Sequence, residues 1–208
     1  MTETFSSIQG EGLAMGRPCF FIRLSGCNLR CNWCDTRYAW RQGEELPLDM
    51  LAAKWLDSGI PLIQITGGEP LLQPAILPLM EYFLEQGATV LLETNGSIDI
   101  SRVPGRVVKI VDRKTPSSGM VACWAERNAG YLRAGDQLKF VLGDRQDYVW
   151  ACRELERLNL RSGVEVLFSP VAGRMNPGEL AEWIVADRLS VRFQLQLHKA
   201  LWGHRRGV

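Results

Sequence analysis

The sequence predicts an α/β fold in which a mostly parallel sheet curves into a partial, open, TIM-like barrel of about six strands with few helices. Short apolar runs alternate with amphipathic segments along the 208 residues, which is typical of parallel strands joined by helices. A complete eight-stranded barrel needs about 250 residues, so this chain is short for one. Polar and glycine-rich motifs follow most of the strands, at the end where parallel α/β folds bind ligands.

The predicted strands are short, mostly apolar runs. The first, 19–24, precedes a cysteine-rich segment, and the third, 89–93, ends in a Thr-Asn-Gly sequence. Runs of this length bounded by turn-forming residues are typical of strands. The other runs cover 62–66, 106–111, 138–142, 164–168 and 191–195.

The intervening segments carry apolar residues at helical spacing. Helices are predicted over 48–56, with Gly59 as a stop, and over 74–85. Further helices are predicted over 148–158 and over 177–187, the last with Asn176 as its N-terminal cap. The segment 120–133 is ambiguous and favours at most a short helix. Because there is no repeat or polar linker, we expect a single domain over 1–208, with the cysteine-rich loop at 25–40.

The composition favours a small-molecule enzyme of the cytoplasm. With 24 basic and 23 acidic side chains, the formal net charge of +1 gives no field that would attract nucleic acid or a membrane. No apolar run approaches the roughly 18 residues of a membrane span, and residues 1–4 do not resemble a signal peptide. Six cysteines, three of them clustered, fit a reducing compartment better than a disulfide framework.

The chain is organised around Cys27, Cys31 and Cys34, which are spaced C-x3-C-x2-C directly after the first strand. Thiolates this close can reach one soft-metal centre, and iron–sulfur clusters are held by such cysteines. Three ligands rather than four indicate a site that keeps one position open for chemistry. The alternative is a structural zinc site that takes its fourth ligand from Cys19, Cys123, Cys152, His198 or His204.

This cysteine spacing after a buried strand resembles the signature of the radical S-adenosylmethionine superfamily. The segments 7–12 (Ser-Ile-Gln-Gly-Glu-Gly), 34–36 (Cys-Asp-Thr) and 196–199 (Gln-Leu-His-Lys) narrow the resemblance to the 7-carboxy-7-deazaguanine synthase family, over residues 9–199. The resemblance implies a partial barrel, a 4Fe–4S cluster on the three cysteines, and S-adenosylmethionine on the fourth iron. It also implies a homodimer and an electron donor such as flavodoxin or ferredoxin.

The reaction that the resemblance implies converts 6-carboxy-5,6,7,8-tetrahydropterin to 7-carboxy-7-deazaguanine. A deoxyadenosyl radical removes hydrogen from C6, the ring contracts and ammonia leaves. The resemblance places cofactor contacts on the Gly-Gly-Glu-Pro motif after the second strand, which could otherwise be only a tight turn. The implied cofactor-binding residues are Trp33, Asp35, Gly67, Gly68, Glu69, Gly96, Gln137, Lys139 and Ser169. For the last three, a plain strand interpretation competes equally.

Glu11 and Arg23 carry the argument for the substrate. A carboxylate can accept from the donor edge of a pterin, and a guanidinium suits its carboxylate group. The alternative is a salt bridge between these two residues at the rim. The resemblance assigns substrate contacts to Ile8, Gln9, Gly10, Glu11, Arg23, Thr94 and His198.

Thr36 is implied by the resemblance to hold a Mg²⁺ ion that also binds substrate, which suits an ion that takes few protein oxygens. Asp112, Lys114, Ser117 and Ser118 form a polar rim that we assign only loosely to substrate or cofactor. The sequence identifies no general base. Two alternatives stay open: a radical enzyme that activates a partner protein by installing a glycyl radical, and a zinc-stabilised binding module.

Overall fold

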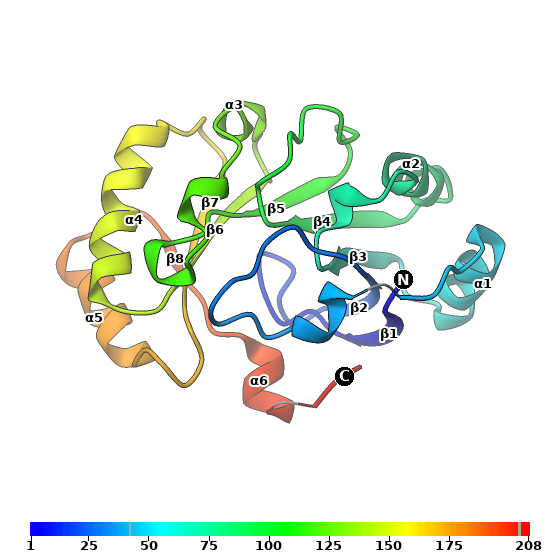
Figure 1. Cartoon of the computed structure of the whole chain (residues 1–208), viewed down its shortest axis with the longest axis horizontal. Coiled ribbons are helices and arrows are strands. Elements are labelled where there is room, and N and C mark those ends of the chain that lie inside the picture. The colour runs from blue at the N-terminus through cyan, green and yellow to red at the C-terminus, as the bar shows by residue number, and fades with distance from the viewer. Residues whose placement is uncertain (42, 204) are drawn as a thin grey trace.

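A computed structural model describes residues 1–41, 43–203 and 205–208. Eight strands form one sheet in chain order, β1 to β8 (Figure 1). β1 is antiparallel to β2, and every later neighbour is parallel. The predicted α/β partial barrel is therefore confirmed. The strands are β1 Glu3–Ile8, β2 Pro18–Leu24, β3 Leu62–Gly67, β4 Thr89–Thr94, β5 Val108–Asp112, β6 Gln137–Leu142, β7 Glu165–Pro170 and β8 Arg192–Phe193.

The sheet has more strands than the predicted six or so, and the unpredicted strand is β1 at one edge. It pairs along its whole length with β2, whereas the sequence predicts no strand before residue 19. β8 is two residues long rather than five. The backbone N–H of its successor Gln194 still donates to the Phe168 carbonyl of β7 at 3.0 Å, and the Gln194 side chain accepts a hydrogen bond from the Gly12 N–H at 2.7 Å. This contact joins the segment after β1 to the segment after β8.

The four predicted helices lie where the periodicity places them, with small shifts at their ends. α4 begins at Arg145 rather than 148, because the Asp144 carboxylate caps it by accepting from the Asp147 N–H at 2.9 Å. Asn176 caps α5 as predicted. The C-terminal helix α6 falls on the Gln-Leu-His-Lys motif and was not predicted. The helices are α1 Leu48–Ser58, α2 Ile76–Glu85, α3 Asn128–Tyr131, α4 Arg145–Leu158, α5 Pro177–Ala186 and α6 Leu197–Trp202, with short 3-10 turns at Arg37–Trp40, Pro70–Leu72, Pro116–Ser118 and Val121–Cys123.

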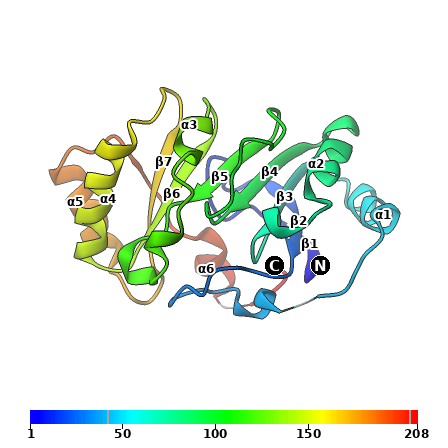
Figure 2. The ribbon, with the colours of Figure 1, turned by 45° about the horizontal axis from the view of Figure 1, so that its top comes forward.

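The outer face of the sheet is apolar and carries the helices. Figure 2 shows α1 and α2 at one end of the sheet and α4 and α5 at the other. Ile22, Ile65, Leu92 and Phe140 are fully buried in the main hydrophobic core together with side chains of these helices. Because successive side chains of a strand point to opposite faces, the neighbours of these residues point inward.

The inner face changes from apolar to polar along the strands. At the amino ends, Cys19, Leu62, Leu91 and Ile110 pack with Ala14 of the β1–β2 connection into a second hydrophobic cluster. Burial raises the pKa of Cys19 to about 12, so this thiol acts as a small apolar side chain. One end of the barrel is thus plugged, and the ligand space lies at the carboxyl ends.

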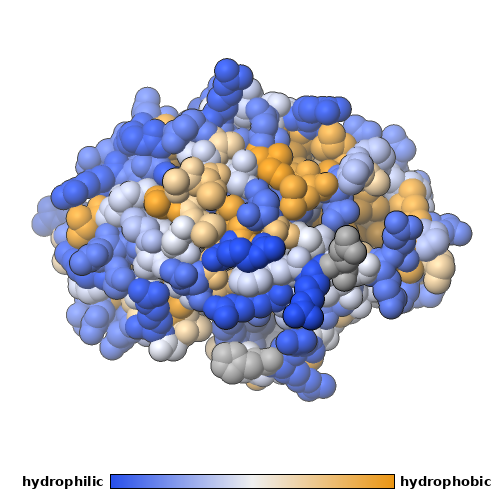
Figure 3. Space-filling model, in the orientation of Figure 1, coloured by the Kyte–Doolittle hydropathy of each residue, from blue (hydrophilic) through white to orange (hydrophobic). Residues whose placement is uncertain are grey.

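The surface in Figure 3 is mostly hydrophilic, with hydrophobic residues gathered near the middle of that face. Within the described ranges, no helix is long and apolar enough to cross a membrane. The six cysteines are all free thiols.

Candidate active site

A cavity of about 580 Å³ lies at the carboxyl ends of the parallel strands. Its wall is built by the loops that follow β2, β3, β4 and β5, by the segment after β1, and by α6. Most of the side chains predicted from the sequence meet there. The lining includes Ile8, Gln9, Gly10, Glu11, Arg23, Cys27, Cys31, Trp33, Cys34, Asp35, Thr36, Gly67, Gly68, Thr94, Lys139 and His198.

The cysteine loop covers one side of this cavity, and Figure 1 shows it in blue in front of the sheet. The Cys27 sulfur accepts from the Leu29 N–H at 3.4 Å and from the Asn95 amide at 3.8 Å. The Cys34 sulfur lies 3.7 Å from the Thr36 hydroxyl. Hydrogen bonds to sulfur are a common way for proteins to tune iron–sulfur clusters.

Burial raises the pKa of the Cys27 and Cys31 thiols, while the Lys114 ammonium favours the thiolate of Cys31. A bound metal centre would deprotonate them. Three soft sulfur donors on one loop, beside a cavity, fit a 4Fe–4S cluster with one iron left for another ligand. Among the residues that the structure describes, no three His, Cys, Asp or Glu side chains are grouped to hold a single metal ion. His204, one proposed zinc ligand, lies outside the described residues.

The paired glycines after β3 allow their backbone to approach closely the backbone at the base of the cysteine loop. A Cβ atom on Gly67 would lie 2.1 Å from the Leu24 carbonyl oxygen, and one on Gly68 would lie 2.1 Å from that of Gly26. The Gly68 N–H donates to Leu24 at 3.1 Å, and the Glu69 N–H donates to Gly26 at 2.8 Å. The motif therefore fixes the base of the cysteine loop and also borders the cavity.

Glu69 lies in the wall of the cavity rather than on its surface. Its fully buried carboxylate accepts from the Leu71 N–H at 3.0 Å, the Thr94 hydroxyl at 2.7 Å and the Asn95 N–H at 2.7 Å. Burial raises the pKa of Glu69, and these hydrogen bonds counter that effect. The carboxylate thus joins the loop after β3 to the loop after β4.

Lys139 forms a charged floor with carboxylates from three other elements. Its ammonium pairs with Glu11 at 2.9 Å, with Asp112 at 3.3 Å and with Glu93. Although burial alone would lower the pKa of Lys139, the three carboxylates raise it well above its ordinary value. Burial opposes ionisation of Glu93, but Lys139 lowers the pKa of Glu93 to about 2. Glu93 was not predicted as a site residue, and its signal is a charge in the inward-facing register of an apolar strand.

The Gln-Gly-Glu-Gly segment is held in place by amide groups. The Gln9 amide donates to Gln64 at 3.0 Å, and the Gln196 amide donates to Glu11 at 2.8 Å. The predicted alternative, a salt bridge between Glu11 and Arg23, is wrong. Glu11 pairs with Lys139, and Arg23 pairs with Glu3 at 2.7 Å.

The helix α6 packs directly on this segment. The Leu197 N–H donates to the Gly10 carbonyl at 3.0 Å, and a Cβ atom on Gly10 would lie 2.3 Å from Nδ1 of His198. Lys199 reaches the cysteine loop, where it pairs with Asp35 at 3.0 Å. α6 thus connects the Gln-Gly-Glu-Gly segment to the cysteine loop across the cavity.

Three further predicted residues lie outside the lining. Gly96 packs against the Trp124 ring, which would lie 2.5 Å from an added Cβ. Gln137 accepts from the Leu13 N–H at 3.0 Å and holds the connection after β1. The Ser169 hydroxyl is buried and has no hydrogen-bond partner in the part of the chain that the structure describes.

The loosely assigned polar rim divides into two pairs. Asp112 and Lys114 line the cavity and are 2.8 Å apart. Ser117 supports Trp33, because the indole N–H donates to its hydroxyl at 3.2 Å, while Ser118 is fully buried.

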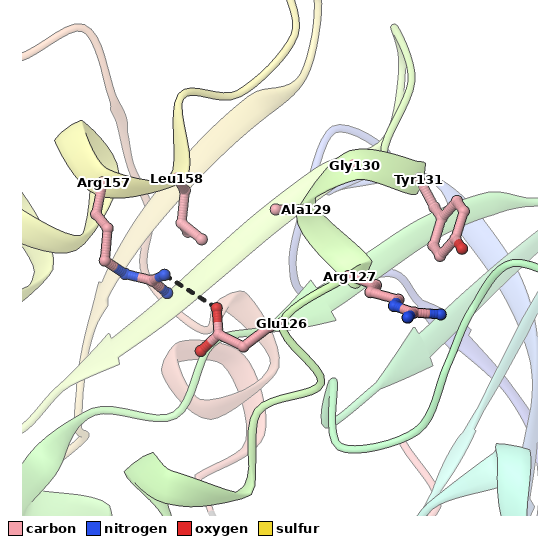
Figure 4. A pocket seen from close by; sticks show the side chains of 7 residues that line it. All are labelled: Glu126, Arg127, Ala129, Gly130, Tyr131, Arg157 and Leu158. Atoms are coloured by element: carbon pink, nitrogen blue, oxygen red, sulfur yellow. Dashed lines mark hydrogen bonds and ion pairs between the residues drawn. The ribbon is translucent and has the colours of Figure 1, made fainter.

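A second, shallower hollow lies elsewhere on the surface, between the α3 region and the end of α4 (Figure 4). An ion pair between Arg157 and Glu126, 2.9 Å long and largely exposed, crosses it. None of the predicted site residues borders this hollow. Its lining is Glu126, Arg127, Ala129, Gly130, Tyr131, Arg157 and Leu158.

The sequence model of the radical SAM superfamily matches residues 21–111, which span β2 to β5 and include the cysteine loop. The fold also matches the solved structure described as QueE from Escherichia coli, with a TM-score of 0.74 at 24% identity, over 95% of this chain and 93% of that one. Fold and cysteine loop together define a radical SAM protein.

Curated relatives extend the match over the whole chain. A 7-carboxy-7-deazaguanine synthase of Koribacter versatilis is 40% identical over 97% of this chain and 96% of its own length. The 7-carboxy-7-deazaguanine synthase of Chlorobaculum tepidum is 39% identical over 97% of this chain and 93% of its own length. The chain belongs to the 7-carboxy-7-deazaguanine synthase family. Membership excludes the zinc-stabilised binding module as its function.

Proposed function

We propose that this protein converts 6-carboxy-5,6,7,8-tetrahydropterin to 7-carboxy-7-deazaguanine with ring contraction and loss of ammonia. The observation that carries the proposal is one cavity in which the cysteine loop faces Gln9, Glu11, Arg23 and His198. The full-length relatives with that name support it. A partly enclosed polar cavity also suits a small molecule better than the protein substrate of a glycyl-radical activating enzyme.

Cys27, Cys31 and Cys34 would hold the cluster, and S-adenosylmethionine would bind its open iron. Together they would supply the radical chemistry that acts at C6 of the pterin. The work of the chain is to place that carbon correctly and to exclude water. Trp33, Asp35, Gly67, Gly68 and the charged Lys139 are the cofactor contacts that the cavity supports. We place Glu69, Gly96, Gln137 and Ser169 in a supporting role behind it.

The pterin would lie between the Gln-Gly-Glu-Gly segment and β2. Glu11 pairs with Lys139, and its carboxylate oxygens can accept from the donor edge of the ring, with Gln9 beside it. Arg23 would bind the carboxylate group. The Thr94 hydroxyl already donates to Glu69, so toward a ligand it can only accept. His198 and the backbone of Ile8 and Gly10 complete this side of the cavity.

Thr36 would be the protein's oxygen ligand for a Mg²⁺ ion that also contacts the substrate. Its hydroxyl lines the cavity beside Cys34. An ion that takes one or two protein oxygens and fills its shell with water and substrate suits such a site.

The reductant in this proposal is a small electron-transfer protein such as flavodoxin or ferredoxin, and the enzyme works as a homodimer in the cytoplasm. Free thiols throughout the chain support a reducing compartment. The dimer rests on the family alone, and the mass of the protein in solution tests it.

The decisive experiment is an anaerobic assay of the reconstituted, reduced protein with S-adenosylmethionine, Mg²⁺ and the pterin. We expect 7-carboxy-7-deazaguanine by mass spectrometry, and we expect Cys31→Ala to lose both product and bound iron. The matched control is Cys123→Ala, which removes an exposed thiol outside the cavity. Deoxyadenosine without a deazapurine would contradict the proposed substrate, and a protein that binds only zinc would contradict the cluster.

A further inference from the structure

Glu3 and Arg23 face each other across the first two strands. They are direct partners in the antiparallel register of β1 and β2, and Oε1 of Glu3 lies 2.7 Å from Nε of Arg23. Their side chains are only 24% and 16% exposed, so solvent screens this pair weakly. Arg23 lines the cavity, whereas Glu3 lies behind it.

Tyr38 also holds the carboxylate of Glu3 in place. Its hydroxyl donates to Oε1 of Glu3 at 2.8 Å, so one oxygen accepts from both Tyr38 and Arg23. The guanidinium carbon of Arg23 lies 5.7 Å from the centre of the Phe5 ring and 5.9 Å from that of Tyr38. Two aromatic rings and one carboxylate therefore restrict the orientation of the guanidinium plane.

The contact at Nε decides which edge of the guanidinium remains for a ligand. A guanidinium can bind a carboxylate through Nε and one terminal nitrogen, or through both terminal nitrogens. Glu3 occupies Nε, and over residues 1–41, 43–203 and 205–208 neither terminal nitrogen of Arg23 donates to the protein. The end-on edge, which is formed by the two terminal nitrogens, therefore remains for a ligand in the cavity.

The charges around this edge favour an anion. Glu3 neutralises Arg23 while the cavity holds no ligand, which keeps a partly buried cation from standing alone. A second guanidinium, that of Arg206, lies 4.0 Å from the centre of the Tyr38 ring. Two guanidinium groups thus lie near the Tyr38 ring, together with one carboxylate, that of Glu3, which accepts from the Tyr38 hydroxyl.

We propose that Glu3 is a positioning residue, which, with Tyr38, turns the end-on edge of Arg23 toward the carboxylate of the substrate. This assignment rests on the proposed function, because it takes the pterin carboxylate as the ligand of Arg23. It gives Glu3 a part in selecting carboxylated pterins over uncharged ones, although Glu3 itself does not border the cavity.

The test compares two unreactive probes on the anaerobic holoenzyme: pterin-6-carboxylate and pterin without the carboxylate. We expect Glu3→Ala to weaken binding of pterin-6-carboxylate by about tenfold, since supporting contacts of this kind commonly contribute that much. Binding of plain pterin should change less than about twofold. In turnover, KM for the true substrate should rise while kcat stays nearly constant, because the lost interaction is one of binding.

Three variants separate positioning from simple stability. Glu3→Gln keeps an oxygen that can accept from Nε, so it should restore most of the affinity for the carboxylated probe. Arg23→Lys removes Nε. In that background, Glu3→Ala should cause no further loss of affinity for pterin-6-carboxylate. The matched control is Glu165→Ala, which removes a similar pair between β7 and β8, with Glu165 2.9 Å from Nε of Arg192 and outside the cavity.

Two results would overturn the assignment alone. One is an equal loss of affinity for both probes in Glu3→Ala, and the other is a loss that persists in the Arg23→Lys background. Wild-type enzyme that binds neither pterin would instead contradict the proposed function, and the assignment of Glu3 with it.

Discussion

Lys139 is the residue on which most of the charge in the cavity depends. Three carboxylates surround its 4% exposed side chain, and each comes from a different element or loop. Removing one partner of a buried ionic group leaves the others uncompensated, which costs far more than the group contributes when paired. The stability of the fold therefore depends on the charges of Lys139 and its carboxylate partners in the cavity.

Replacing Lys139 by Met keeps the length of the side chain and removes its charge. We expect the free energy of unfolding to fall by about 3–5 kcal/mol, because three carboxylates lose their cation. Urea unfolding of the reduced protein without its cluster measures this loss.

The loss should depend on pH in a defined direction. Glu93 has its pKa lowered from 4.5 to about 2 in the folded protein. Its stabilisation is complete above the unfolded value and disappears as the pH falls toward 2. The difference between the wild type and Lys139→Met should narrow over that window, and a constant difference would contradict the role of Glu93.

Lys109→Met is the matched control for the site. Lys109 is equally buried and pairs with Asp136 at 2.9 Å, but it does not line the cavity. The Lys109→Met variant should also lower the free energy of unfolding, but it should leave substrate affinity unchanged.

Gly10 illustrates a residue whose importance lies in the absence of a side chain. Gly10→Ala would place a Cβ atom 2.3 Å from His198 Nδ1 and 3.1 Å from its backbone nitrogen, so α6 must move. We expect kcat/KM to fall by about 10–100-fold, the usual cost of misplacing site groups by about an ångström. Gly130→Ala, where an added Cβ meets nothing within 4 Å, is the control. Normal activity of Gly10→Ala would mean that α6 need not lie against this residue.

At the scale of elements, α6 connects two sides of the cavity. It contacts the Gln-Gly-Glu-Gly segment through Gln196 and Leu197 and the cysteine loop through Lys199. No extensive apolar face holds this six-residue helix, since none of its residues is buried. Its position therefore depends on polar contacts.

Lys199→Met should loosen α6. The pair with Asp35 is partly exposed, so we expect a loss of about 0.2–1 kcal/mol that becomes smaller at high salt. Hydrogen exchange of the amides in Leu197–Trp202 should become faster. Arg174→Met, which removes an exposed pair with Asp144 at 3.2 Å, should not change it. Unchanged exchange in Lys199→Met would show that the other contacts hold α6 by themselves.

The elements that the sequence predicted well are those with strong local signals. α1 and α5 end or begin at a glycine and an asparagine that the structure uses as caps. α6 and the early end of the predicted strand 191–195 could not be predicted, because Gln194 and Gln196 have hydrogen-bond partners near residue 12. Such a contact between residues 182 positions apart leaves no periodic trace in the sequence.

At the scale of the whole molecule, the position of the cavity followed from the sequence, but its charge network did not. Cys27, Cys31, Cys34 and the strand-end motifs meet at one rim because parallel strands end on the same side. Which acid pairs with which base depends on register, and here Lys139 lies beside Asp112 in the β5–β6 pairing. The register of β1 and β2 likewise places Arg23 opposite Glu3, while Glu11 pairs with Lys139.

The hydrogen bond between Gly12 and Gln194 also has a meaning for the newly made chain. The cysteine loop leaves the ribosome before residue 194 does, so the contact between residues 12 and 194 must wait until residue 194 has been translated. A chain that has not yet reached residue 194 would thus have the three cysteines of the loop but would lack the opposite wall of the cavity. The order of translation thus keeps the cysteine loop without a complete substrate pocket until residue 194 has been added.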